Sequence, residues 1–227
     1  MFERLERVIG INNLNKIKSK TVAIVGVGGV GGYTVETLIR NGVENVIIVD
    51  KDIVDITNKN RQIIADDNTI GKNKVDILKK RIQSINSNCN VINLKIFLNN
   101  ENKEELFNNK IDYLVDACDT VTTKIMLIEE CLKRNIKIIS SMGTGNKLDP
   151  KKLEITTLDK TSYDPLAKVI RTKMKKLNID KTIPVLSSKE EIIKTGIRTP
   201  GSYSVVPNTA GILIADYIIK DILKTED

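Results

Sequence analysis

The stretch Thr21–Gly31 reads TVAIVGVGGVG and decides the fold. Its first five residues form a short apolar run rich in β-branched side chains, which is typical of a buried parallel strand. Glycines then follow at the spacing of a loop that leads a strand into a helix and receives phosphates on the helix N-terminus. These glycines are Gly26, Gly28, Gly29 and Gly31. The stretch therefore predicts a nucleotide-binding loop.

The same alternation of strand and helix continues along the chain. Further strands are expected at 46–49, 90–96, 113–117 and 137–141, and helices at 30–40, 72–85 and 122–134. The pattern predicts an α/β fold with a Rossmann-like, doubly wound, mostly parallel sheet. After Gly143 an antiparallel C-terminal extension is expected, with strands at 153–158, 183–186 and 203–206 and helices at 166–177 and 208–223. Without repeats or linkers, residues 1–227 are predicted to form one domain.

The composition excludes several kinds of chemistry. The chain has no histidine, and its three cysteines (Cys89, Cys118 and Cys131) form no C-x-x-C pair. This argues against a structural zinc site, a disulfide framework and any nucleophile activated by histidine. No apolar run is long enough to span a bilayer, and the N-terminus resembles no targeting peptide. We expect a cytoplasmic protein without a membrane partner.

Positive charge is concentrated in the second half of the chain. The net charge is +7, and residues 160–198 hold ten lysines and arginines against four acidic residues. We therefore predict that residues 160–200 form a basic elaboration within the domain, with a polyanion such as nucleic acid as its partner. The alternative is a solvated surface, because the chain is rich in lysine throughout.

Asp50 ends the second predicted strand, where a carboxylate can accept hydrogen bonds from ribose hydroxyls. With the glycine loop it predicts nucleotide binding, and this much fits an NAD-dependent oxidoreductase equally well. Asn58, Arg61 and Lys74 follow and could converge on a phosphate tail. For Lys74 alone, a loop salt bridge is the simpler interpretation.

The fourth predicted strand ends with Asp116 and, three residues on, Asp119. Two carboxylates across from a phosphate-binding loop are suited to hold Mg²⁺. The alternative role for Asp119 is that of a helix N-cap. A hydride-transfer site needs neither Mg²⁺ nor cations directed at a triphosphate, so these residues favour ATP over NAD.

Together these motifs, with Phe2-x-Arg4 near the N-terminus, resemble the ubiquitin-activating-enzyme-like (ThiF-like) adenylyltransferases. The resemblance implies ATP binding and Mg²⁺-assisted adenylation of a carboxylate. It places Asp50 on the ribose, Asn58, Arg61 and Lys74 on the phosphates, and Asp119 on Mg²⁺. It also implies that Arg4 reaches the site of a neighbouring subunit, hence a homodimer. The implied catalytic residues are Arg4, Arg61, Lys74 and Asp119.

Within that family, the chain lacks the zinc-binding cysteine pairs usual in members that activate sulfur-carrier proteins. It also has no thiol in residues 143–200, where thioester-forming members need one. Cys118 and Cys131 are interpreted as core residues. An adenylyltransferase acting on a carrier protein thus remains the alternative.

The C-terminal half, with Asp164-Pro165-Leu166 and the stretch Gly201–Pro207, resembles the tRNA threonylcarbamoyladenosine dehydratases. This second resemblance implies ATP-dependent cyclisation of a modified tRNA nucleoside. It also implies tRNA contacts through Lys168, Arg171 and Lys175, and a possible monovalent cation.

Overall fold

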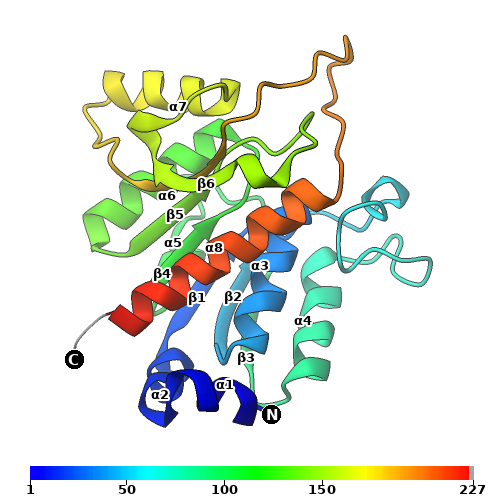
Figure 1. Cartoon of the computed structure of the whole chain (residues 1–227), viewed down its shortest axis with the longest axis vertical. Coiled ribbons are helices and arrows are strands. Elements are labelled where there is room, and N and C mark those ends of the chain that lie inside the picture. Colours follow the sequence, from blue (N-terminus) through cyan, green and yellow to red (C-terminus); the bar gives the residue numbers. More distant parts are fainter. Residues whose placement is uncertain (225–227) are drawn as a thin grey trace.

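Seven strands form one sheet in the order β3-β2-β1-β4-β5-β7-β6 in the computed structural model, which describes residues 1–224 (Figure 1). All neighbours are parallel except β6, which pairs antiparallel with β7 at the edge. The Rossmann-like fold predicted from the sequence, with its antiparallel C-terminal extension, is confirmed. The strands are β1 (Thr21–Val25), β2 (Asn45–Val49), β3 (Asn90–Leu94), β4 (Tyr113–Asp116), β5 (Lys137–Ser141), β6 (Leu153–Thr157) and β7 (Pro184–Ser188).

Helices cover both faces of this sheet (Figure 1). They are α1 (Glu3–Ile9), α2 (Ile11–Ser19), α3 (Gly29–Arg40), α4 (Lys74–Ile85), α5 (Glu104–Phe107), α6 (Val121–Arg134), α7 (Pro165–Lys176) and α8 (Val205–Lys224). Helices α3, α4 and α8 pack on one face, and α5, α6 and α7 on the other. Within residues 1–224, no helix is both long enough and apolar enough to cross a membrane.

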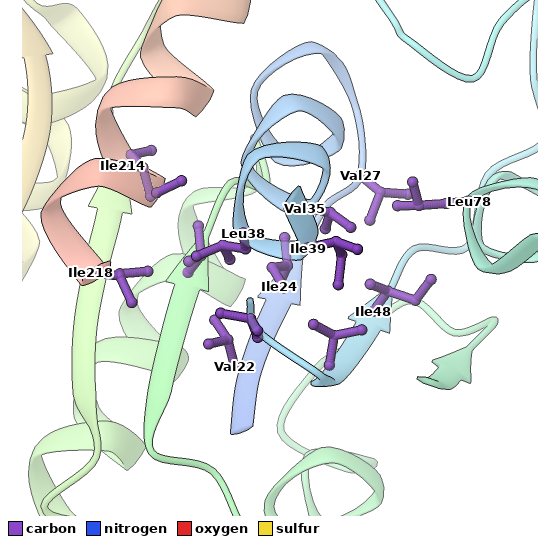
Figure 2. Packing of buried hydrophobic residues seen from close by; sticks show 14 of the residues in the cluster. Val22, Ile24, Val27, Val35, Leu38, Ile39, Ile48, Leu78, Ile214 and Ile218 are labelled. Carbon is purple, nitrogen blue, oxygen red and sulfur yellow. The ribbon is translucent and has the colours of Figure 1, made fainter. Parts of the chain in front are cut away.

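Successive side chains of the central strand β1 point to opposite faces of the sheet and belong to two separate hydrophobic cores. In β1, Val22 and Ile24 point toward α3 and α8, while Ala23 and Val25 point toward α6. All four are at most 4% exposed, as a strand covered on both faces requires. Figure 2 shows the first core, where side chains of α3, α4 and α8 meet those of β1 and β2.

The first core depends on a close crossing of α3 and α8. A Cβ atom added to Gly211 of α8 would lie 2.3 Å from the carbonyl oxygen of Val30 in α3, so the two backbones nearly touch. The Thr34 hydroxyl donates to the Gly211 carbonyl at 3.1 Å across this contact. Glycine is required here because any side chain would separate the helices.

The structure differs from the sequence prediction in several places. Residues 203–206 form no strand: they turn into α8, which begins at Val205 and has Pro207 in its first turn, where proline is tolerated. Helices α1, α2 and α5 were not predicted, since α1 has no buried residue and α5 is a single turn. Strand β7 begins and ends later than expected.

We expect Gly211→Ala to destabilise the protein, although alanine favours helices by up to about 1 kcal/mol over glycine. The added methyl must push α8 away from α3, which costs about 1–3 kcal/mol. Urea unfolding would measure the change, with Ile212→Ala on the exposed side of α8 as the control. A more stable Gly211→Ala variant would show that the helices do not approach this closely.

Candidate active site

A cavity of about 490 Å³ lies at the carboxyl ends of β1, β2 and β4. Its wall includes the glycine loop after β1, Asp50 after β2 and the segment 117–120 after β4. In open α/β sheets this edge is where ligands bind. Helices α1 and α2 lie at the opposite end of the sheet (Figure 1).

The glycine loop is held tightly between neighbouring strands. Gly26 has a φ of +88°, and a Cβ atom on it would lie 2.7 Å from the Ala117 carbonyl oxygen. A Cβ atom on Gly31 would lie 1.9 Å from the Gly26 carbonyl oxygen. Side chains at these two positions would collide with the backbone, so β1, α3 and the end of β4 meet only because both residues are glycine.

Gly28 and Gly29 leave the start of α3 open to the cavity. Gly28 is the N-cap residue, and no side chain caps this helix. A Cβ atom on Gly28 would meet nothing closer than the Gln62 Nε2 atom, 3.7 Å away. The first-turn N–H groups and the positive end of the helix dipole are therefore available to an anion.

Asp50 sits at the edge of the cavity and braces the loop. Its Oδ2 accepts a hydrogen bond from the Val27 backbone N–H at 2.9 Å, and its Oδ1 accepts one from the Asp52 N–H at 2.9 Å. Each oxygen retains a lone pair. The carboxylate is thus fixed in position and can still accept hydrogen bonds from hydroxyl groups.

Asn58 and Arg61 come from a tight turn that begins at Asp55. The Asp55 carboxylate accepts from the Thr57 N–H at 2.8 Å, and the Asn58 Oδ1 accepts from the Asp55 N–H at 3.1 Å. Arg61 Nη1 donates to the Thr57 carbonyl at 2.9 Å, which holds the guanidinium along the turn. Both predicted side chains line the cavity.

Lys74 is buried at the start of α4, with 8% of its side chain exposed. Its Nζ lies 3.0 Å from the Asp52 Oδ2, so the salt bridge considered from the sequence does form. Lys74 nevertheless lines the cavity. Since an ammonium group has three donors, the ion pair positions Lys74 and leaves capacity for a phosphate oxygen.

Asp119 lines the cavity and is exposed, whereas Asp116 does not line it. Asp116 is fully buried: its Oδ2 lies 3.0 Å from the Lys124 Nζ of α6 and accepts from the Ser140 hydroxyl at 2.5 Å. The expectation that Asp116 shares a metal is therefore wrong, because its charge is neutralised inside the protein. The N-cap of α6 is Thr120, so Asp119 does not fill that role.

A protein-only metal site is absent from the part of the chain that the structure describes. Residues 1–224 contain no group of three or more Cys, Asp or Glu side chains that could hold a metal ion. A cation beside Asp119 would need its other ligands from a bound molecule and water, as is usual for Mg²⁺.

Cys118, which lines the cavity, and Cys131 of α6 are both thiols with raised pKa values. Cys131 is fully buried, and burial raises its pKa to about 12. Burial and the neighbouring Asp116 also raise the pKa of Cys118. Since the thiolate is the reactive form, neither residue is suited to be a nucleophile. The interpretation as a core residue is confirmed for Cys131, whereas Cys118 is only partly buried and lines the cavity.

The far end of the cavity is apolar, which the sequence reasoning missed. Ile96, Phe97 and Leu98 line it, and the Lys51 Nζ lies 4.9 Å from the centre of the Phe97 ring. The available signal was the apolar run Ile96-Phe97-Leu98, which begins two residues after β3 and whose first residue lay within the strand predicted at 90–96. Gln62, which follows Arg61 in the same motif, lines the wall with a buried Oε1 that has no hydrogen-bond partner.

The remaining predicted residues lie outside this cavity. Arg4 is exposed on α1 and does not line it. Lys168 and Lys175 are exposed on α7. Arg171 is partly buried, and its Nη1 donates to the Thr161 carbonyl at 3.0 Å, so this guanidinium already serves the fold.

Known proteins with the same fold match the chain over its whole length. A model of the ThiF family matches residues 2–227. The tRNA threonylcarbamoyladenosine dehydratase of Bacillus subtilis (strain 168) is 44% identical, covering 98% of this chain and 94% of that protein. The E. coli tRNA N6-threonylcarbamoyladenosine dehydratase in complex with ATP is 29% identical, with a TM-score of 0.92, covering 98% of this chain and 93% of that one. Its complex with AMP is 28% identical, with a TM-score of 0.91 and coverage of 96% and 92%.

We expect Gly28→Ala to weaken mainly ATP binding and Gly26→Ala to lower mainly the stability of the fold. Gly28→Ala should lower affinity for ATP by about tenfold, or ~1.4 kcal/mol, because its methyl enters the cavity. It should cost less than about 1 kcal/mol of stability, as an N-cap change. Gly26→Ala should cost about 2 kcal/mol or more, because its backbone is strained and crowded. Thermal melts with and without ATP would measure both, and unchanged ATP affinity in Gly28→Ala would contradict the assignment.

Proposed function

The chain belongs to the ThiF family, and from that premise we propose that it is an ATP-dependent tRNA threonylcarbamoyladenosine dehydratase. The observation that carries the proposal is the gathering of Arg61, Lys74 and Asp119 around one glycine loop. Two cations and a free carboxylate suit a triphosphate with its metal. A dinucleotide used for hydride transfer needs none of the three.

Successive parts of the cavity wall suit the adenine, the ribose and the phosphates of ATP. The apolar end at Ile96–Leu98 suits the adenine ring, and Asp50 accepts hydrogen bonds from the ribose. The open start of α3 binds phosphates, and the Arg61 guanidinium and Lys74 ammonium bind the remaining phosphate oxygens. Asn58 donates its side-chain amide to the same tail.

Mg²⁺ fits at Asp119, whose exposed carboxylate lines the cavity and makes no ion pair within residues 1–224. Mg²⁺ commonly takes one or two carboxylates together with substrate phosphates. When bound, it would neutralise the negative charge that develops on the departing pyrophosphate. The monovalent cation that the resemblance implies stays a prediction.

The proposed reaction has two steps. First, a carboxylate oxygen of the threonylcarbamoyl group attacks the α-phosphorus of ATP, forming an acyl–phosphate bond and releasing pyrophosphate. Next, a nitrogen of the same group attacks the activated acyl carbon, loses its proton and displaces AMP. The net result is a ring formed with loss of water, whose oxygen leaves in AMP. Because the nucleophile belongs to the substrate, neither a histidine nor an activated cysteine is required.

The tRNA would contact the basic elaboration, residues 160–200, where Lys168 and Lys175 are exposed on α7. Phosphate contacts of this kind position a nucleic acid without reading its sequence. A tRNA substrate and the low cysteine content favour the cytoplasm as the place of action. A carrier-protein partner is not required.

We expect the protein to dehydrate threonylcarbamoyladenosine in tRNA when it is incubated with ATP and Mg²⁺. Mass spectrometry of the nucleosides would detect a product lighter by one water molecule. One AMP should form for each nucleoside dehydrated. Asp119→Asn should lower the rate by about 10²–10³-fold, since it weakens metal binding at the reacting phosphates.

The control is Glu105→Gln, which removes an exposed carboxylate of α5 outside the cavity. If the wild-type protein leaves verified, modified tRNA unchanged, the proposed function is wrong. AMP formation only with a carrier protein ending in Gly-Gly would favour the alternative adenylyltransferase.

The proposal includes a homodimer in which Arg4 of one subunit completes the site of the other. Arg4→Ala and Asp119→Asn should each be nearly inactive alone. Mixed subunits should recover about a quarter of the wild-type activity, because half of the dimers then contain one intact site. The measurement is AMP release after co-refolding or subunit exchange. No recovery, with mixed dimers verified by mass spectrometry, would exclude a role for Arg4 across the interface.

A further inference from the structure

A second cavity, of about 560 Å³, adjoins the nucleotide cavity. The two cavities share six wall residues: Gly28, Gly29, Arg61, Ala117, Cys118 and Asp119. Four of them, Gly28, Gly29, Arg61 and Asp119, are the residues proposed to hold the phosphates and Mg²⁺. A molecule in the second cavity would therefore face the phosphate end of the nucleotide.

The second cavity is lined by the loop after β5, the start of α7 and the extended segment 189–204, here named the strap. Figure 1 shows the strap as the orange stretch of chain before α8. Asn146 fastens the strap to the loop: its N–H donates to the Gly201 carbonyl at 2.9 Å, and its Oδ1 accepts from the Gly201 N–H at 2.6 Å. Asn60 donates to the Ser202 carbonyl at 2.9 Å, which ties the strap to the turn that carries Arg61.

Lys147 lines this cavity and directly follows Asn146 in the chain. Only 1% of its side chain is exposed, and its Nζ has no hydrogen-bond partner. The nearest carboxylate oxygen of its ion-pair partner, Asp164 Oδ2, is 3.9 Å away, which is too far for a hydrogen bond.

The carboxylates around Lys147 are already bonded to backbone groups. Asp164 accepts hydrogen bonds from the N–H of Gly143 at 2.8 Å and of Ala167 at 3.0 Å. Glu190 accepts from the N–H groups of the two residues that follow Lys147. Burial lowers the pKa of Lys147, and the two carboxylates oppose this effect. The fold thus encloses an amine without giving it an acceptor.

An enclosed ammonium without a hydrogen bond costs free energy, which a bound oxygen atom would recover. Resting on the proposed function, we propose that the second cavity receives the modified nucleoside and that Lys147 binds an oxygen atom of its threonylcarbamoyl group. The rotatable four-carbon chain of lysine lets the ammonium turn toward a ligand without backbone movement. The carboxylate to be adenylated would then lie beside the wall shared with the nucleotide.

The position of α7 is consistent with this arrangement. Its N-cap residue Asp164 and its first two residues, Pro165 and Leu166, form part of the cavity wall, and its exposed lysines, Lys168 and Lys175, lie further along the helix. An RNA strand lying along α7 could therefore place one nucleotide into the cavity.

The test is Lys147→Met, with Lys151→Met, an exposed lysine nearby, as the control. We expect Lys147→Met to raise the KM for modified tRNA by about 10–100-fold, as expected for the loss of a hydrogen bond from a charged donor. Its Tm should equal or exceed that of the wild type, because a buried charge is removed. The ATP-induced shift in Tm should stay unchanged, and Lys147→Gln should recover part of the loss.

Filter binding without ATP separates this inference from the proposed function. The wild type should bind modified tRNA more tightly than unmodified tRNA, and Lys147→Met should lose that preference while Lys151→Met keeps it. A preference retained in Lys147→Met overturns the inference even if the protein proves to be a dehydratase. A lower Tm together with weaker ATP binding would also overturn it, since Lys147 would then be structural.

Discussion

Three contacts between backbones, each with no room for a Cβ atom, organise the molecule. Gly31 lies against the Gly26 carbonyl, Gly26 against the Ala117 carbonyl, and Gly211 against the Val30 carbonyl. They bring β1, the end of β4, α3 and α8 to one point. The start of α3 is left uncovered at that point, beside the edge where three parallel strands end. The backbone packing at this point thus creates the phosphate-binding site at the start of α3, and the charged side chains add to it.

Buried charges divide into two kinds in this protein. Lys124 and Asp116 are both fully buried and satisfy each other, with help from the Ser140 hydroxyl. This pair holds the end of β4 in place, and neither residue lines the nucleotide cavity. Lys74 and Lys147 are also buried, but one keeps spare donors and the other has no hydrogen bond at all. A buried cation left incompletely bonded beside a cavity indicates a binding role, whereas a fully paired one indicates a structural role.

The sequence was sufficient for the seven strands of the sheet because their signals are local, although it also predicted a strand at 203–206 that does not form. The β-branched runs ending in glycine or aspartate located β1, β2 and β4, and the position of Asp50 followed from them. Side-chain direction was not local: Asp116 and Asp119 are three residues apart, yet one faces Lys124 in the interior and the other faces the cavity. No spacing rule distinguishes them, because the partner comes from α6. The role of Lys147 could not be predicted from the sequence for the same reason, because the residues around it come from segments distant in the chain.

The α3–α8 crossing also affects how the chain folds. The Thr34–Gly211 hydrogen bond joins residues 177 positions apart, and α8 is the last helix among the described residues. During synthesis, the side of α3 that carries Val30 and Thr34 stays uncovered until α8 leaves the ribosome. Contacts of such long range slow folding and expose intermediates to aggregation. Truncation within α8 would leave this side of α3 exposed on an otherwise formed sheet.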